Sequence, residues 1–292
     1  MKRTLEFVID CGQENMDVRT FVRRYLGFSA RILTALKYEG EMLKNGEPVH
    51  SNAVLKAGDT LTLTLLETGE AYEKADLPFA VLYEDEDFLV LDKPYNMPVH
   101  PSPGHDRDSV LNAAAWYFQN TPDFVFRPLY RLDRDTTGAL VLAKNKFAAN
   151  AKLTKTYRAV CEGETPESGC VNVPIGLKPG HKVERCAGIG DEAVTEFQTV
   201  KTSSGYSLVD FHLKTGRTHQ LRVHLASIGH PILGDELYGI GSALISRQAL
   251  HAAALSFPLP GSGELKTVVA PFPGDLRALL ERKGWEVRDC EP

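Results

Sequence analysis

The stretch RLDRDTTGALVLA, residues 131–143, joins a charged segment to an apolar strand through a tight turn. Its residues 136–138, Thr-Thr-Gly, are typical of turns, and the five residues after them are apolar. This pattern predicts that Asp133 lies in a loop at the mouth of a strand and not within a core strand. The two arginines of the stretch flank Asp133, and nearby cations stabilise an ionised carboxylate. Because such a turn is usually a solvated cluster of salt bridges, the stretch alone does not establish a catalytic acid.

Short apolar and β-branched runs continue on both sides of this turn, with few helical stretches between them. They are FAVLYEDEDFLVLDKP (79–94), which folds around an acidic turn, TYRAVCEG (156–163), VTEFQTV (194–200) and YSLVDFHL (206–213). The proline-rich NMPVHPSPGHD (96–106) is expected to be an irregular loop. Together these runs predict an α+β domain built on a mixed, largely antiparallel sheet.

The N-terminal part has a different organisation. Apolar residues at helical spacing predict two short helices within 17–37, and the turn dipeptides Asn45-Gly46 and Gly58-Asp59 punctuate short strands after them. We therefore expect a small α/β domain over 1–70, a linker over 71–78 in a Glu-rich polar stretch, and a main domain over 79–292.

Composition limits the class of protein. The chain has 292 residues, of which 43% are hydrophobic, so it can bury a sizeable core. Its five cysteines form no CxxC pair and their number is odd, which argues against a disulfide framework and a zinc site. No apolar run approaches the ~18 residues that cross a membrane. We expect a cytoplasmic protein, without metal or membrane contact.

Charge is distributed unevenly along the chain. The formal net charge is -5, which counts against nucleic-acid binding as a whole. Residues 17–37, however, hold five basic residues against one acid, and residues 211–230 hold three basic residues and four histidines without any acid. Two local basic surfaces on an acidic protein are compatible with a face that binds RNA, although scattered solvated charges would explain either one alone.

A second motif is KTGRTHQLRVHLASIGHP, residues 214–231. Thr218 can cap a helix that begins after the Gly216 turn, and Leu221, Leu225 and Ile228 would form its buried stripe. Arg222 lies on a different face of this helix. It is therefore free to meet a carboxylate from elsewhere, although an ordinary amphipathic helix would show the same pattern.

Several motifs together strongly resemble, in order, the RluA-type pseudouridine synthases. They are RLDRDTTGALVLAKN, KTYRAVCEG, GRTHQLRVHLASIGHPILGDELYG, RQALHA and VVAPFP, within residues 79–280. The N-terminal domain is similar to the alpha-L RNA-binding motif, which is ribosomal-protein-S4-like and often joined to these enzymes.

The resemblance implies an enzyme that cleaves the N-glycosidic bond of a uridine in RNA and rejoins the base through C5, without a cofactor. Asp133 matches the catalytic aspartate, whose route, covalent addition or removal of a C2′ proton, stays open. Arg222 matches its paired arginine and Tyr157 the tyrosine against the target base. Arg131 resembles the residue that fills the gap left by the flipped uridine. Further predicted RNA contacts are Lys155, Arg217, His219, Gln220, Arg23 and Arg31.

Two departures from the family accompany this resemblance. Tyr130 stands where many relatives have histidine. The interval from Asp133 to Tyr157 is 157 − 133 = 24 residues, which is shorter than usual, and the amphipathic helix expected there is largely missing.

Other functions remain as alternatives. A non-catalytic RNA-binding or ribosome-assembly protein would have no reason to keep the three matched residues together, and a glycoside hydrolase needs a second facing carboxylate. Ribosomal RNA of the large subunit is the first expected substrate, because an accessory RNA-binding domain is more common on relatives that modify it; transfer RNA is the second. A monomer is expected. The target uridine and the oligomeric state are not readable from the sequence.

Overall fold

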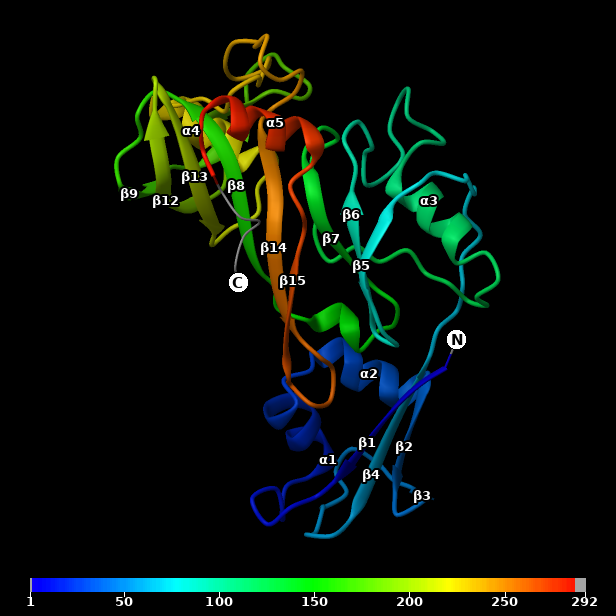
Figure 1. Cartoon of the computed structure of the whole chain (residues 1–292). Coiled ribbons are helices and arrows are strands. Elements are labelled where there is room, and N and C mark those ends of the chain that lie inside the picture. Colours follow the sequence, from blue (N-terminus) through cyan, green and yellow to red (C-terminus); the bar gives the residue numbers. More distant parts are fainter. Residues whose placement is uncertain (1, 287–292) are drawn as a thin grey trace.

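The computed structural model describes residues 2–286, which form two large β-sheets with separate hydrophobic clusters and a two-stranded hairpin. Figure 1 shows the smaller sheet at one end of the molecule with α1 and α2, and the larger sheet at the other end with α4 and α5. Within the described residues, no helix is long and apolar enough to cross a membrane.

The small sheet has four strands in the order β1-β4-β2-β3, namely β1 (Lys2–Val8), β4 (Thr60–Leu66), β2 (Gly40–Lys44) and β3 (Glu47–Pro48). Strand β4 alternates threonine with leucine, which directs Leu61, Leu63 and Leu65 into the core, where they are fully buried. Strand β1 was not expected from the sequence. It pairs antiparallel with β4 along its whole length, from Lys2 opposite Leu66 to Val8 opposite Thr60.

The helices predicted within 17–37 are present, and with the four-stranded sheet they form the small module, residues 2–66. They are α1 (Val18–Thr20), which continues into the π-helical η1 (Phe21–Tyr25), and α2 (Ala30–Tyr38). Asp17 accepts a hydrogen bond of 2.7 Å from the backbone N of Thr20, and Ser29 caps α2 through the N of Ile32. Their buried residues belong to the same hydrophobic cluster as the leucines of β4. The basic residues of 17–37 lie on the exposed faces of these helices.

The large sheet is mixed and largely antiparallel, as predicted. Its order is β5-β6-β7-β14-β8-β13-β12-β9, with β15 beside β14, and among the strands of residues 2–286 only β7 and β14 run parallel. The strands are β5 (Ala80–Glu84), β6 (Phe88–Lys93), β7 (Thr137–Ala143), β8 (Thr154–Glu162), β9 (Ser168–Asn172), β12 (Val194–Ser203), β13 (Tyr206–Leu213), β14 (Leu250–Pro258) and β15 (Leu265–Val269).

Helices and a small hairpin surround this sheet. They are α3 (Val110–Tyr117), α4 (Gln220–Ser227), α5 (Gly274–Arg282), the 3-10 turn η2 (Ala148–Asn150), and the hairpin of β10 (Ile175–Leu177) with β11 (Arg185–Ala187). The single turn η2 is all the helix that lies between β7 and β8, in agreement with the short interval in the sequence.

Strand β7 begins earlier than the turn residues suggested. Thr137 and Gly138 already belong to it, and Gly138 has a φ of 111°. A Cβ atom at this position would lie 2.3 Å from the carbonyl oxygen of Ala252 on β14. Glycine is therefore required at this position because β7 and β14 approach each other closely, and not because the chain turns there.

The two sheets are joined by defined contacts. Phe147, next to η2, is 1% exposed and belongs to the hydrophobic cluster of the small module, with its ring 5.3 Å from that of Phe28. Arg3 of β1 donates two hydrogen bonds of 2.8 Å to Asp87. Glu67, just before the predicted linker, is buried and accepts a 2.9 Å bond from Arg127. Within the predicted linker 71–78, the backbone N of Ala75 donates to the carbonyl of Asn112 at 3.1 Å.

Candidate active site

A cavity of about 770 Å³ lies between α4, β8 and the loops around residues 98–102 and 129–136. It brings together eight of the ten residues singled out from the sequence: Arg131, Asp133, Lys155, Tyr157, Arg217, His219, Gln220 and Arg222. The other two, Arg23 and Arg31, belong to the small module, whose helices Figure 1 places at the opposite end of the molecule from α4.

Asp133 lies in a loop, as predicted, and pairs with an arginine from another element. The Nη1 atom of Arg222 donates to its Oδ2 at 3.2 Å, while the backbone N of Thr136 donates to its carbonyl oxygen. The expectation that its neighbours in the sequence hold it was wrong for Arg134, which donates to Asp135 at 2.9 Å. Arg134 lies inside the turn that the bond from Thr136 N to the Asp133 carbonyl closes, and its side chain meets Asp135 within that turn.

Arg222 is itself held by a carboxylate that the sequence analysis did not single out. Asp235, fully buried, accepts from Nε at 2.6 Å and from Nη2 at 2.8 Å. Burial opposes the charge of Arg222, but Asp235 and Asp133 outweigh it and raise the pKa of the guanidinium. The arrangement is a bidentate pair with one further donor directed at Asp133. Asp235 is part of the matched GDELYG stretch, which was its only sequence signal.

The start of α4 differs from the prediction. His219, and not Thr218, occupies the N-cap position, and it makes no side-chain cap bond there. Its φ of 57° is in the left-handed region. Leu221 and Leu225 are buried as expected, but Ile228 is 37% exposed because the helix ends at Ser227.

Two tyrosines lie in the cavity wall. Tyr157 of β8 is 5% exposed, and burial, followed by the charge of Asp133, raises the pKa of its hydroxyl. Tyr130 donates a short hydrogen bond to the backbone carbonyl of Ala139. Burial, followed by Tyr157, raises the pKa of Tyr130 as well. Both phenols are therefore protonated at neutral pH.

Three cationic side chains surround the mouth of the cavity. Arg131 is exposed. Lys155 has its Nζ 4.9 Å from the centre of the Tyr130 ring, and burial lowers the pKa of this amine. Arg217 donates from Nε to the carbonyl of Glu192 at 2.9 Å and pairs loosely with Asp191. An anionic polymer would meet positive charge on several sides of Asp133.

Gln220 does not fit the RNA contact predicted for it. It is 2% exposed, and its amide donates to the carbonyl of Val194 and the hydroxyl of Thr195, both at 3.0 Å. Its Oε1 accepts from the backbone N of Arg217 and the hydroxyl of Thr215. These bonds attach the start of α4 to β12, so the amide of Gln220 is used inside the protein although the residue borders the cavity.

His219 has a partner that the sequence did not reveal. Its Nδ1 lies 2.7 Å from the hydroxyl of Tyr238, and that hydroxyl accepts a bond from the backbone N of Arg185. The hydroxyl hydrogen therefore points to Nδ1, which leaves the neutral imidazole protonated at Nε2. Burial lowers the pKa of His219, in agreement with a neutral ring. The ring of Tyr238 also lies 5.0 Å from the guanidinium carbon of Arg222.

The loop that carries Asp133 is held by hydrogen bonds from two buried basic side chains, Lys93 and Arg247. Lys93 is 0% exposed, and its Nζ donates to three carbonyls, those of Pro94, Met97 and Arg134, each at 2.8 Å. Arg247 donates to the carbonyl of Asp135 at 3.3 Å. Burial lowers the pKa of Lys93, but three acceptors match the three protons of an ammonium group. The loop is thus tied to β6 on one side and to the segment before β14 on the other.

The site offers oxygen and nitrogen groups for acid–base and nucleophilic chemistry. Among residues 2–286 there is no group of three or more His, Cys, Asp or Glu side chains that could hold a metal ion. The carboxylate of Asp133 uses Oδ2 for Arg222, and in the described part of the chain no hydrogen bond engages Oδ1. This oxygen is the one available to a substrate.

Three comparisons with known proteins point to the same kind of relative. A sequence profile described as RNA pseudouridylate synthase matches residues 87–227. The chain is 35% identical over 295 residues to the uncharacterized RNA pseudouridine synthase YhcT of Bacillus subtilis (strain 168), which covers 95% of this chain and 96% of that protein. It is 34% identical over 290 residues to ribosomal large subunit pseudouridine synthase D of Vibrio parahaemolyticus, which covers 88% and 87%. The solved structure of human RNA pseudouridylate synthase domain containing 4 has a TM-score of 0.57 and 26% identity, over 71% of this chain and 94% of that one.

Proposed function

Because the chain belongs to the RluA-type RNA pseudouridine synthases, we propose that it isomerises uridines of large-subunit ribosomal RNA, with Asp133 as the reacting carboxylate. The observation that carries the assignment of Asp133 is its ion pair with Arg222 inside a cavity that also holds Tyr157. A reacting carboxylate must stay ionised beside an anionic polymer, and a fixed guanidinium favours that form.

The reaction is an isomerisation and needs no electrons from outside. The bond between N1 and C1′ breaks, a bond between C5 and C1′ forms, C5 loses a proton, and N1 gains one. The proposed part of Asp133 is to present Oδ1 to the ribose or the base while Arg222 holds Oδ2. Arg222 then stabilises the negative charge whenever it returns to the carboxylate.

Tyr157 is proposed to stack against the target base and to take part in the loss of the C5 proton. Its raised pKa keeps the phenol neutral, so the oxygen can accept this proton only as its own hydrogen leaves for a neighbouring acceptor. A buried tyrosine at the base plane supplies both a ring face and such an oxygen.

Lys155, Arg217 and Arg131 are proposed to hold the RNA around the flipped uridine. Flipping costs a few kcal/mol of lost stacking. The exposed guanidinium of Arg131 is planar and can stack in the space that the base leaves. Lys155 has no ion-pair partner within the described residues, which leaves its charge for a phosphate.

The small module is proposed to be an alpha-L RNA-binding domain that grips a different part of the same RNA. Its exposed residues include five basic side chains, at positions 19, 23, 24, 31 and 37, and two aromatic ones, Tyr25 and Tyr38, which are 55% and 82% exposed. Basic and aromatic side chains together are typical of RNA-binding surfaces. Arg23 and Arg31 are proposed to contact RNA on this surface, at a distance from Asp133. The proposed place of action is the cytoplasm, and the proposed state a monomer.

Mapping pseudouridines in ribosomal and transfer RNA, by carbodiimide labelling and reverse transcription, tests this function. We expect cells without the gene to lose a pseudouridine of the large-subunit RNA. The native gene should restore it, and a gene with Asp133→Asn should not. Loss confined to transfer RNA would move the substrate to that class. Restoration by Asp133→Asn would favour a non-catalytic role on the same fold.

A further inference from the structure

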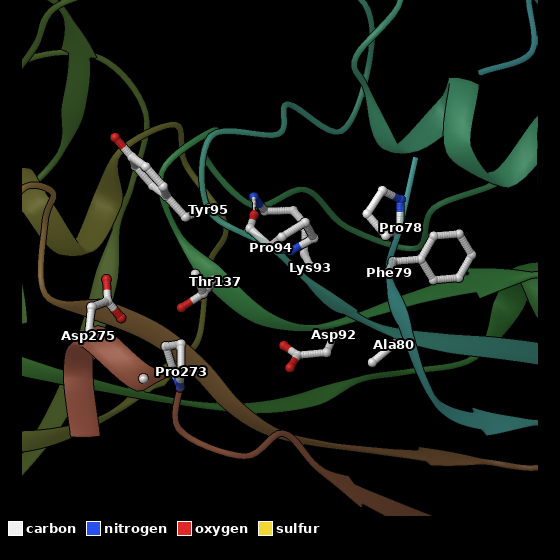
Figure 2. A pocket seen from close by; sticks show the side chains of 11 residues that line it. Pro78, Phe79, Ala80, Asp92, Lys93, Pro94, Tyr95, Thr137, Pro273 and Asp275 are labelled. Carbon is white, nitrogen blue, oxygen red and sulfur yellow. Dashed lines mark hydrogen bonds between the residues drawn. The ribbon is translucent and has the colours of Figure 1, made fainter. Parts of the chain in front are cut away.

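A second cavity, of about 530 Å³, shares no lining residue with the Asp133 cavity and lies between β5, β6, the start of β7 and the start of α5. Its lining is mostly apolar and includes three prolines, Pro78, Pro94 and Pro273, and the aromatic residues Phe79 and Tyr95. Figure 2 shows these side chains around an open space, with the carboxylate of Asp92 on the side that faces Pro273. The volume is that of an ordinary small-molecule site.

Within the described residues, the charged groups of this cavity are already engaged, with one exception. Asp275 accepts two hydrogen bonds from Arg247, at 2.7 and 2.9 Å, and the hydroxyl of Thr137 lies 2.9 Å from Nδ1 of His251. The Nζ of Lys93 donates to the carbonyls of Pro94, Met97 and Arg134 and not into the cavity.

Asp92 is the exception. Among residues 2–286, no hydrogen bond or ion pair reaches its carboxylate, and its oxygens are open to the cavity. Burial raises the pKa of Asp92 to about 6, and the charge of Lys93 opposes this rise only in part. At neutral pH the cavity therefore contains one unpaired carboxylate among apolar side chains.

We propose that this cavity binds an organic cation, a primary ammonium group on a short aliphatic chain, with the ammonium on Asp92 and the chain against the prolines and Phe79. A single unpaired carboxylate attracts a cation and disfavours an anion. A metal ion would need several oxygen ligands, and the apolar walls supply none. An alkyl chain buries apolar surface on these walls, as the stem of a lysine does. Two sources share this chemistry: a free amine and the lysine side chain of another protein.

The test is a titration of the full chain with n-butylammonium chloride, followed by backbone amide signals at constant ionic strength. Two variants probe the site. Asp92→Asn removes the charge with little change of shape, and Ala80→Leu keeps the charge but fills the cavity from an exposed position on β5. Glu281→Gln removes an exposed acid of α5 outside the cavity and is the matched control.

We expect saturable shifts near Asp92 for the native chain and Glu281→Gln, and binding at least ~10-fold weaker for both cavity variants. The neutral analogue 1-butanol should bind more weakly than butylammonium, and equally to the native chain and Asp92→Asn. Equal affinity of butylammonium for the native chain and Asp92→Asn would overturn the proposal, as would the absence of saturation. Parallel titrations with 1,4-diaminobutane, which represents a free amine, and with N-acetyl-lysine amide, which represents a lysine side chain, identify the source. The tighter-binding probe indicates which source the cavity prefers.

Discussion

Asp235 fixes the guanidinium of Arg222 through Nε and Nη2, and neither of these atoms is the one that reaches Asp133. The planar guanidinium thus has its orientation set on one edge, while the remaining nitrogen, Nη1, is directed at the carboxylate of Asp133. Asp235 is fully buried and does not line the cavity. Besides Arg222, its Oδ1 accepts from the backbone N of Leu237 and of Tyr238, at 3.0 and 3.3 Å. It is a positioning residue, and its loss should have a recognisable kinetic signature.

We expect Asp235→Asn to lower kcat by about 10- to 100-fold, because a misplaced Arg222 no longer holds Asp133 in the productive geometry. KM for the RNA should change little, since Asp235 does not face the cavity. Steady-state kinetics on one RNA stem-loop separate the two constants. Asp191→Asn, which removes an exposed partner of Arg217, is the control and should leave kcat unchanged. A rise in KM with an unchanged kcat for Asp235→Asn would contradict the positioning role.

The sequence predicted much of this site, for identifiable reasons. Asp133 follows from a turn that precedes an apolar strand, and Arg222 follows from a helix whose apolar residues leave it on another face. Their pairing depends on two elements 89 residues apart, and the matched motifs, not local charge, indicated it. Local charge favoured the adjacent Arg134, which in the structure serves Asp135 instead.

Other features could not be read from the sequence, because they arise only in the folded chain. Strand β1 lacks a turn signal of its own and is defined by its pairing with β4, about 60 residues later. Gln220 looks like a polar surface residue, yet its amide is used entirely inside the protein. Gly138 reads as a turn residue, although its function is the close contact of β7 with β14.

The contact through Phe147 is expected to hold the small module against the main sheet. Phe147→Ala would open a cavity in the cluster that it shares with Phe28, so the free energy of unfolding should fall by about 3 to 5 kcal/mol. Urea denaturation measures this change, and Phe147→Leu, which keeps most of the apolar volume, should lose much less. Equal stability of the two variants would mean that the contact does not support the fold.

The basic surface of the small module can be tested through salt dependence. Arg31 is exposed on α2, and if it touches a phosphate, Arg31→Gln should make the plot of log affinity against log salt shallower by about 0.7 to 0.9. Filter binding to ribosomal RNA fragments at several salt concentrations gives the slope. Arg282→Gln, an exposed change on α5 at the other end of the molecule, should not alter it. An unchanged slope for Arg31→Gln would remove this residue from the RNA surface.

The unpaired Asp92 should also affect stability, with a definite dependence on pH. Its pKa is raised by burial from 3.8 to about 6, so between these values the folded chain binds a proton that the unfolded chain has lost. Its contribution to stability is therefore present below pH 4 and lost as pH rises through 6. Asp92→Asn should stabilise the protein at pH 7.5 by about 1 kcal/mol, a small value because water screens a partly exposed carboxylate, and the gain should vanish near pH 4. Denaturation in buffers free of organic cations measures it; destabilisation at pH 7.5 would reveal an ionic partner of Asp92.

Removal of Arg222 and removal of Arg131 should lower kcat/KM in different ways on folded and unpaired RNA. Arg222→Ala takes the partner from Asp133 whatever the shape of the RNA, so kcat/KM should fall equally on a folded stem-loop and on an RNA whose target uridine is already unpaired. Arg131→Ala removes only the group proposed to stack in the gap left by the flipped base. Its loss should be greater on the folded RNA, where about 1 to 3 kcal/mol of stacking must be recovered, than on the unpaired one.

The deciding quantity is the ratio of kcat/KM on the folded RNA to kcat/KM on the unpaired RNA, measured for each variant and for the native enzyme. We expect this ratio to be unchanged in Arg222→Ala and lower by about 5- to 150-fold in Arg131→Ala, the range that 1 to 3 kcal/mol corresponds to. Arg131→Lys is the matched control, because it keeps the charge and loses the planar group, so it should resemble Arg131→Ala if stacking is the cause. If Arg131→Lys instead behaves as the native enzyme, Arg131 acts on phosphate through its charge and does not fill the gap.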